Sequence, residues 1–168
     1  MSIPTRQALP PENYLILLGA SLCVFSSNNA FVIENILRID RSNLAWHDLI
    51  DLESGQLKPH VARTITKKSC DSSIASLFNE IVSMRNRIIH SLQITAEDGT
   101  QVLATKVKKT HEQFRITEDY LVSFLKQNEE LSNLLHEYRG YQPPRVSSVS
   151  RPDNPRGAFV LTICQAST

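Results

Sequence analysis

The stretch that decides the fold is Asp71–Ser91, DSSIASLFNEIVSMRNRIIHS, which has the periodicity of a long amphipathic helix. Asp71, Ser72 and Ser73 offer oxygens that can cap its first turn. With Ile74 set to zero at about 100° per residue, the apolar side chains fall within about 80° on either side. They are Leu77, Phe78, Ile81, Val82, Met84, Ile88 and Ile89. This arc therefore faces a core or a partner.

Arg85 falls near the centre of this apolar arc, at about +20°. A guanidinium there is costly unless it is paired or serves a function, and a core acid such as Glu34 would be a structural partner. A polar edge flanks the arc at about 120° to 180° and consists of Asn79, Ser83, Asn86 and His90. A His at the end of a helix is often only a favourable contact with the helix dipole.

The functional interpretation rests on the chemistry of the same side chains. An arginine can clamp a phosphate through two parallel hydrogen bonds, and a histidine can move protons near neutral pH. An asparagine between them can hold a ring nitrogen or a hydroxyl in place. From the residues alone, the structural and functional interpretations both stay open.

Met84–Ser91, MRNRIIHS, resembles the signature of the HEPN family, in which an Arg is followed by a polar residue and, shortly afterwards, by a His. Here Asn follows the Arg, and four residues separate Arg85 from His90. The resemblance covers roughly residues 12–139, although only Arg85–His90 is specific. It implies an all-α, up-and-down helical bundle. It also implies a metal-independent ribonuclease that works as a dimer, with its two motifs facing each other, so that Arg85 and His90 would be catalytic and Asn86 would orient or polarise.

The rest of the chain predicts one helical domain between two irregular ends. Residues 1–11 carry Pro4, Pro10 and Pro11 and form a lead-in, and residues 12–139 form the HEPN-like domain. Its first helix is expected at Glu12–Arg38, and its last helix begins at Thr117 and stops at Gly140. Residues 140–168, rich in Pro, Ser and Arg, are expected to be a flexible tail, within which Ala158–Cys164 could dock as a strand.

A small β-hairpin is expected directly after the motif helix, at about residues 92–107. Asp98-Gly99 lies there between two β-prone segments and is a good hairpin turn. We expect this insertion to leave the core all-α. The hairpin and the tail are not part of the minimal HEPN pattern, so the subfamily stays open.

Length, composition and charge set the outer limits. A chain of 168 residues suits one domain, and its net charge of +1 gives no strong field toward nucleic acid or membranes. Its three cysteines are an odd number and far apart, which is typical of free thiols in a reducing compartment. The apolar run Leu15–Phe25 is too short to span a bilayer, and its helical stripe continues past any cleavage site. With Asn29 filling a gap, that stripe consists of Leu15, Leu18, Leu22, Phe25, Val32 and Ile36. The expected location is therefore cytoplasmic, with no membrane partner.

Several basic residues are candidates for contact with an RNA backbone. They are Arg87, Lys67, Lys68, Lys106, Lys108 and Lys109. A solvated surface explains them equally well. The chain has no Gly-rich phosphate loop and no cluster of residues that suggests a catalytic metal, so no cofactor or metal is expected.

These observations favour an endoribonuclease that cleaves RNA by attack of the 2′-hydroxyl, leaving a 2′,3′-cyclic phosphate and a 5′-hydroxyl. It would act as a homodimer, as the toxin of a toxin–antitoxin or phage-defence system, with a protein such as a small nucleotidyltransferase as its antitoxin. One alternative is a noncatalytic HEPN-like module that binds RNA, a nucleotide or a protein. Another is an unrelated helical interaction protein.

Overall fold

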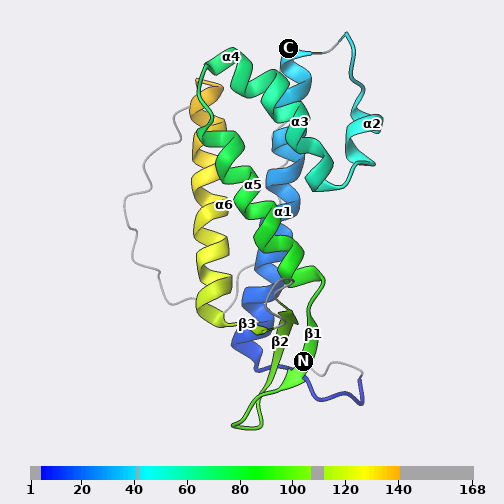
Figure 1. The fold of residues 1–168 in the computed structure, drawn as a ribbon, viewed down its shortest axis with the longest axis vertical. Helices are drawn as coiled ribbons and strands as arrows, with labels where there is room; N and C mark the ends of the chain where they lie inside the picture. The colour runs from blue at the N-terminus through cyan, green and yellow to red at the C-terminus, as the bar shows by residue number, and fades with distance from the viewer. Residues whose placement is uncertain (1–4, 41, 107–111, 141–168) are drawn as a thin grey trace, which may run out of the picture.

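Three long helices form the body of the protein: α1 (Glu12–Ile39), α5 (Ser73–Ile89) and α6 (Glu118–Tyr138). The computed structural model describes residues 5–40, 42–106 and 112–140. The three helices run along the long axis, with α1 and α6 parallel and α5 antiparallel to both (Figure 1). Side-chain contacts join the starts, middles and ends of α1 and α6, which fixes their parallel arrangement.

A chain of short helical turns connects α1 to α5 at one end of the bundle. It consists of α2 (Trp46–Ile50), a 3₁₀ turn at Ser54–Leu57, α3 (Lys58–Val61), a π turn at Ala62–Thr66 and α4 (Lys67–Ser69). Leu57, Val61 and Ile65 are fully buried, so this segment covers the core between α1 and α5.

The apolar face predicted for α5 is confirmed except at Ile89, which is 43% exposed, and that of α1 is confirmed in part. The side chains of Phe25, Val32 and Ile36 are buried on α1, whereas Leu22 is 42% exposed. The buried polar residue of that stripe is Asn28, not Asn29 as predicted. The face of α1 that packs against α6 therefore does not coincide with the predicted stripe and lies beside its centre.

The sheet that follows α5 corrects the all-α prediction. It has three antiparallel strands in the order β1 (Leu92–Thr95), β2 (Gln101–Lys106) and β3 (Gln113–Ile116), between α5 and α6 (Figure 1). The predicted hairpin is confirmed as β1 and β2, with Gly99 at φ 83° in its turn. β3 was missed because its four residues carry little periodicity and the six residues that connect it to β2 contain no Gly, Pro or Asn to signal a turn.

Tyr14, near the start of α1, fastens the sheet to the bundle. Its buried hydroxyl donates to the carbonyl oxygen of Ile116 at 2.8 Å and accepts the N–H of Leu103 at 3.2 Å. The same side chain therefore contacts β2 and β3. Thr117 then caps α6 by accepting the N–H of Tyr120, as predicted.

By length and composition alone, α1 could cross a membrane, since it has 28 residues and a mean hydropathy of 1.7 over its most apolar window. The predicted run Leu15–Phe25 was judged too short to span a bilayer, but it is only part of this longer helix. A core helix of a water-soluble protein passes the same test. The buried polar residues Asn28 and Asn35 contact α6, which suits a core helix.

Three predictions fall outside the described residues. They are the flexible tail beyond Gly140, the strand at 158–164, and the RNA-contact candidates Lys108 and Lys109.

Candidate functional site

The predicted motif lies where α5 ends. Arg85 is half-buried, whereas Asn86 and His90 are exposed. His90 is the C-cap, with φ −95° and ψ 17°, and its N–H donates to the carbonyl oxygen of Asn86 at 3.0 Å. The chain therefore leaves helical geometry at the imidazole-bearing residue itself.

One cleft of about 550 Å³ brings the three motif residues together. On an ideal helix, Arg85 and His90 would lie about 140° apart, on different faces. Both nevertheless line this cleft, because Asn86 and Ile89, which lie between them around the helix, line it too. Its other walls come from α1 and from the loop between α2 and the 3₁₀ turn, and they include Phe25, Ser26, Asn29, Glu53 and Ser54.

Arg85 does not form the structural ion pair that was its simplest alternative. Glu34 pairs instead with Arg139, at 2.8 Å. The Nη1 of Arg85 donates to the side-chain oxygen of Asn86 at 3.1 Å, and its guanidinium carbon lies 5.5 Å from the ring centroid of Phe25. Its Nε is buried and has no hydrogen-bond partner among the described residues. A positive charge without a carboxylate partner therefore lines the cleft.

Four polar residues of the cleft were missed by the sequence analysis: Ser26, Asn29, Glu53 and Ser54. Asn29 was read only as a gap in an apolar stripe, yet it lines the cleft, and its Oδ1 is buried without a partner in the described part of the chain. Glu53 also lines the cleft and caps the 3₁₀ turn. The helical spacing of Phe25 and Asn29 could have placed Asn29 beside Phe25, but no local signal connects either residue to Arg85.

The predicted RNA-contact residues lie in different places. Arg87 does not line the cleft and instead lies over the ring of Phe114, at 4.6 Å. Lys67 and Lys68 belong to α4, which precedes α5, so the full length of α5 separates them from His90 (Figure 1). Among the candidates that the structure describes, Lys106 lines a second cavity together with His90.

That second cavity, of about 370 Å³, lies against the sheet. His90 shares it with side chains of all three strands, including Leu92, Ala104, Lys106 and Gln113. The imidazole therefore lies between the Arg85 cleft and the sheet. Leu92, which is 75% exposed, makes this side of the motif apolar.

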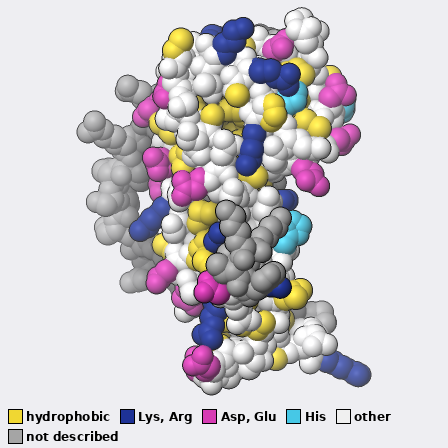
Figure 2. Space-filling model, in the orientation of Figure 1, with side chains coloured by type: hydrophobic (Ala, Val, Ile, Leu, Met, Phe, Trp, Pro, Cys, Tyr) yellow, Lys and Arg dark blue, Asp and Glu magenta, His cyan; other side chains and the backbone are white. Residues whose placement is uncertain are grey.

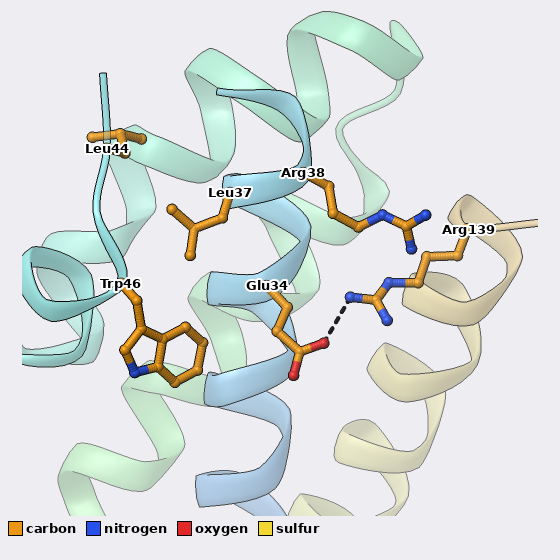
Figure 3. Close-up of a pocket in the computed structure, with 6 residues that line it drawn as sticks. All are labelled: Glu34, Leu37, Arg38, Leu44, Trp46 and Arg139. Atoms are coloured by element: carbon orange, nitrogen blue, oxygen red, sulfur yellow. Dashed lines mark hydrogen bonds and ion pairs between the residues drawn. The ribbon is translucent and has the colours of Figure 1, made fainter. Parts of the chain in front are cut away.

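A further cleft of about 550 Å³ lies at the other end of α1 (Figure 3). It contains Trp46, Leu37, Arg38 and the Glu34–Arg139 ion pair. Arg139 is also held by Asn35 at 3.0 Å and lies over the Phe31 ring at 4.3 Å. These contacts connect the ends of α1 and α6, so Arg139 has a structural role here.

Charge is distributed evenly, as the net charge of +1 suggests. Basic and acidic side chains are interspersed over the face that Figure 2 shows. Within residues 5–40, 42–106 and 112–140, no group of three or more His, Cys, Asp or Glu side chains is placed to hold a metal ion. The charge that an anionic ligand would meet at the motif is therefore local, and comes from Arg85.

Comparison of the chain with models of protein families, with curated proteins and with solved structures found no match.

Proposed function

We propose that the protein is a metal-independent endoribonuclease of the HEPN type. The observation that carries this proposal is the single cleft that gathers Arg85, Asn86 and His90, although the helical wheel separates the first and last of them. A phosphate-binding guanidinium, a proton-transferring imidazole and an orienting amide are the groups that cleavage of RNA by its own hydroxyl requires. The helical body, in which α5 runs antiparallel to α1 and α6, is compatible with the bundle that the resemblance implies.

In the proposed reaction, the 2′-oxygen of the ribose attacks the adjacent phosphorus and forms a new P–O bond. The bond from phosphorus to the 5′-oxygen breaks, leaving a 2′,3′-cyclic phosphate and a 5′-hydroxyl. One imidazole accepts the 2′-hydroxyl proton and another protonates the departing 5′-oxygen. Arg85 balances the negative charge that develops on the phosphoryl oxygens, and Asn86 orients the imidazole or the sugar.

Two copies of the chain would complete this site. Each cleft contains one histidine, His90, whereas the reaction uses one proton acceptor and one proton donor. Exposed apolar side chains surround the motif, and large surface groups of this kind mark interaction sites. They are Leu22, Ile50, Ile89 and Leu92. A two-fold dimer across this surface would bury them and bring two His90 side chains to one shared cleft.

The proposed biological role is a cytoplasmic toxin of a toxin–antitoxin or phage-defence system, restrained by an antitoxin such as a small nucleotidyltransferase. The same apolar surface around the motif would be the natural target for such an antitoxin, because covering it would block both the cleft and the dimer. Arrest of growth on expression, relieved by His90→Ala, would support this role.

The decisive experiment incubates the purified protein with total cellular RNA in the presence of a chelator. We expect fragments ending in a 2′,3′-cyclic phosphate, no cleavage of DNA, and a loss of about a hundredfold or more in His90→Ala. His47→Ala is the matched control, because His47 is an exposed histidine of α2 that does not line the cleft. Arg85→Lys should also be crippled, because an ammonium cannot reproduce the planar fork of a guanidinium.

Three results would count against this proposal: a requirement for magnesium, products with a 5′-phosphate, or full activity in His90→Ala. The first two would indicate a different nuclease chemistry, and the third would remove His90 from the reaction. Absence of any cleavage would favour a noncatalytic HEPN-like module that binds RNA, a nucleotide or a protein.

A further inference from the structure

Two complementary polar atoms without partners line the candidate cleft. The Nε–H of Arg85 is a donor without an acceptor, and the Oδ1 of Asn29 is an acceptor without a donor, among the described residues. Four other buried polar side-chain atoms also have no partner there, but they belong to residues outside the cleft: Ser21, Thr66, Gln127 and Tyr138. An unpaired buried polar atom is unfavourable, so two complementary ones in one cleft need an explanation.

Phe25 places the two atoms in the same part of the cleft. Phe25 and Asn29 lie one turn apart on α1, so their side chains are neighbours on one helical face. The guanidinium of Arg85 lies over the Phe25 ring, at 5.5 Å. Arg85 thus reaches from α5 to the face of α1 that carries Asn29, and all three residues line the cleft.

We propose that Asn29 is a positioning residue for Arg85, which rests on the proposed ribonuclease function. When a phosphate of RNA enters the cleft, the Asn29 Oδ1 accepts the Nε–H of Arg85. The two Nη groups then remain free for the phosphoryl oxygens, while the guanidinium keeps its contact with the Phe25 ring. In the free protein, by contrast, Nη1 donates to Asn86, at 3.1 Å.

This arrangement gives a role to the buried amide oxygen of Asn29. A guanidinium held at Nε has a fixed plane, and a bidentate contact with phosphate requires such a plane. Asn86 would be released from Nη1 at the same time, and its side-chain oxygen could then accept a hydrogen bond from the imidazole of His90 or from the sugar. Binding of one phosphate would therefore organise the whole motif.

The test compares Asn29→Leu, which removes the acceptor, with Asn29→Asp, which keeps an acceptor oxygen. Cleavage of total cellular RNA should fall about 10- to 100-fold in kcat for Asn29→Leu, with little change in KM, and should largely survive in Asn29→Asp. Gln127→Leu is the matched control, because it removes another unpartnered buried amide oxygen, outside the cleft. Thermal unfolding should show Asn29→Leu at least as stable as the wild type, which a structural role would not allow.

Coupling to Arg85 is tested by a double-mutant cycle. If Asn29 acts through Arg85, Asn29→Leu should cause no further loss in the Arg85→Lys background. A second full loss there would show that Asn29 acts independently and would overturn the inference, as would wild-type kcat in Asn29→Leu.

A spectroscopic measurement separates this inference from the ribonuclease proposal. The Arg85 Nε–H resonance, assigned by its disappearance in Arg85→Lys, should become protected from solvent exchange when a fully 2′-O-methylated RNA oligonucleotide is added. Protection that persists in Asn29→Asp and vanishes in Asn29→Leu would support the inference even in a protein that does not cleave RNA. A wild-type resonance that gains no protection would overturn it, whatever the cleavage assay shows.

Discussion

The side-chain amide of Asn28 donates to two oxygens of Asn128, the backbone carbonyl at 2.6 Å and the side-chain carbonyl at 3.2 Å. Both residues are buried, so this contact joins α1 to α6 in the middle of an apolar interface. Asn128 in turn donates to the carbonyl oxygen of Phe124, at 2.8 Å. Because only one alignment of the two helices pairs these amides, the contact fixes how far α1 extends past α6, and with it the position of the cleft wall on α1.

Replacing both amides should therefore cost less than the sum of the two single replacements. Asn28→Leu leaves the buried groups of Asn128 without their donor, which typically costs about 1–3 kcal/mol. Denaturant unfolding followed by circular dichroism should show that loss, and should show the double variant Asn28→Leu/Asn128→Leu to be less destabilised than the two single effects added together. Asn13→Leu, on the exposed start of α1, is the control. Additive effects would mean that the two amides do not form a unit.

Tyr14→Phe should weaken the attachment of the sheet. The substitution removes the hydroxyl that donates to the carbonyl oxygen of Ile116 and accepts the N–H of Leu103. Both backbone groups lose this partner, at a cost of about 1–3 kcal/mol. Hydrogen exchange of the β2 and β3 amides should accelerate more than that of α6. Uniform acceleration across the protein would show instead that Tyr14 supports the whole core.

The same hydroxyl gives a pH dependence. Burial raises the pKa of Tyr14 above its ordinary value of 10.0, and the carboxylate of Glu118 raises it further, while the hydrogen bond from Leu103 opposes both. The folded state thus holds the phenol proton more tightly than the unfolded state. This contribution to stability is complete below about pH 10 and is lost as pH rises through the higher folded-state pKa. Melting temperature should fall more steeply above pH 10 in the wild type than in Tyr14→Phe, and equal slopes would contradict this.

The dimer predicts a mass of about 38 kDa by light scattering at micromolar concentration, twice the 19.0 kDa chain. Ile89→Glu should shift the protein toward monomer and lower its specific activity, because Ile89 is 43% exposed beside the motif. Val122→Glu is the control, since Val122 is 36% exposed on α6 and lines none of the cavities near His90. A wild-type protein that is strictly monomeric and fully active would contradict the proposed shared cleft.

Glu53→Gln tests whether the active site is shared between two copies or lies within one chain. Glu53 is the other titratable side chain that faces the cleft with Arg85 and His90. A glutamine keeps an oxygen for the cap that Glu53 provides, but it cannot transfer a proton at neutral pH. We expect cleavage within about threefold of the wild type, because His90 of the second copy supplies the second proton transfer. A loss comparable to that of His90→Ala would assign that role to Glu53.

Removing residues 142–168 should leave the melting temperature nearly unchanged and weaken RNA binding. This segment carries Arg145, Arg151 and Arg156 against one acid, Asp153, and basic segments add a salt-dependent affinity for phosphates. A large loss of stability would show that part of the segment belongs to the fold.

The sequence predicted the parts of the fold that depend on local periodicity and capping. The apolar face of α5, the Thr117 cap and the Asp98-Gly99 hairpin are all short-range features, and the structure has them. β3 was not predicted because it is only four residues long and the connection from β2 contains none of the usual turn residues. Only the cleft residues that α5 contributes could be predicted. The motif lies on α5, but Asn29 and Glu53 reach it through the packing of other segments.

The position of His90 at the C-cap has a consequence for how the motif can vary. Inside a helix, one inserted residue rotates everything beyond it by about 100°. Beyond Ile89, however, an added residue enters the short non-helical connection to β1, so the imidazole would be displaced along the cleft and not turned to the opposite face. One residue added between Ile89 and His90 should therefore disturb the motif less than one added between Phe78 and Arg85, which lies inside the helix and would turn the guanidinium away from the cleft.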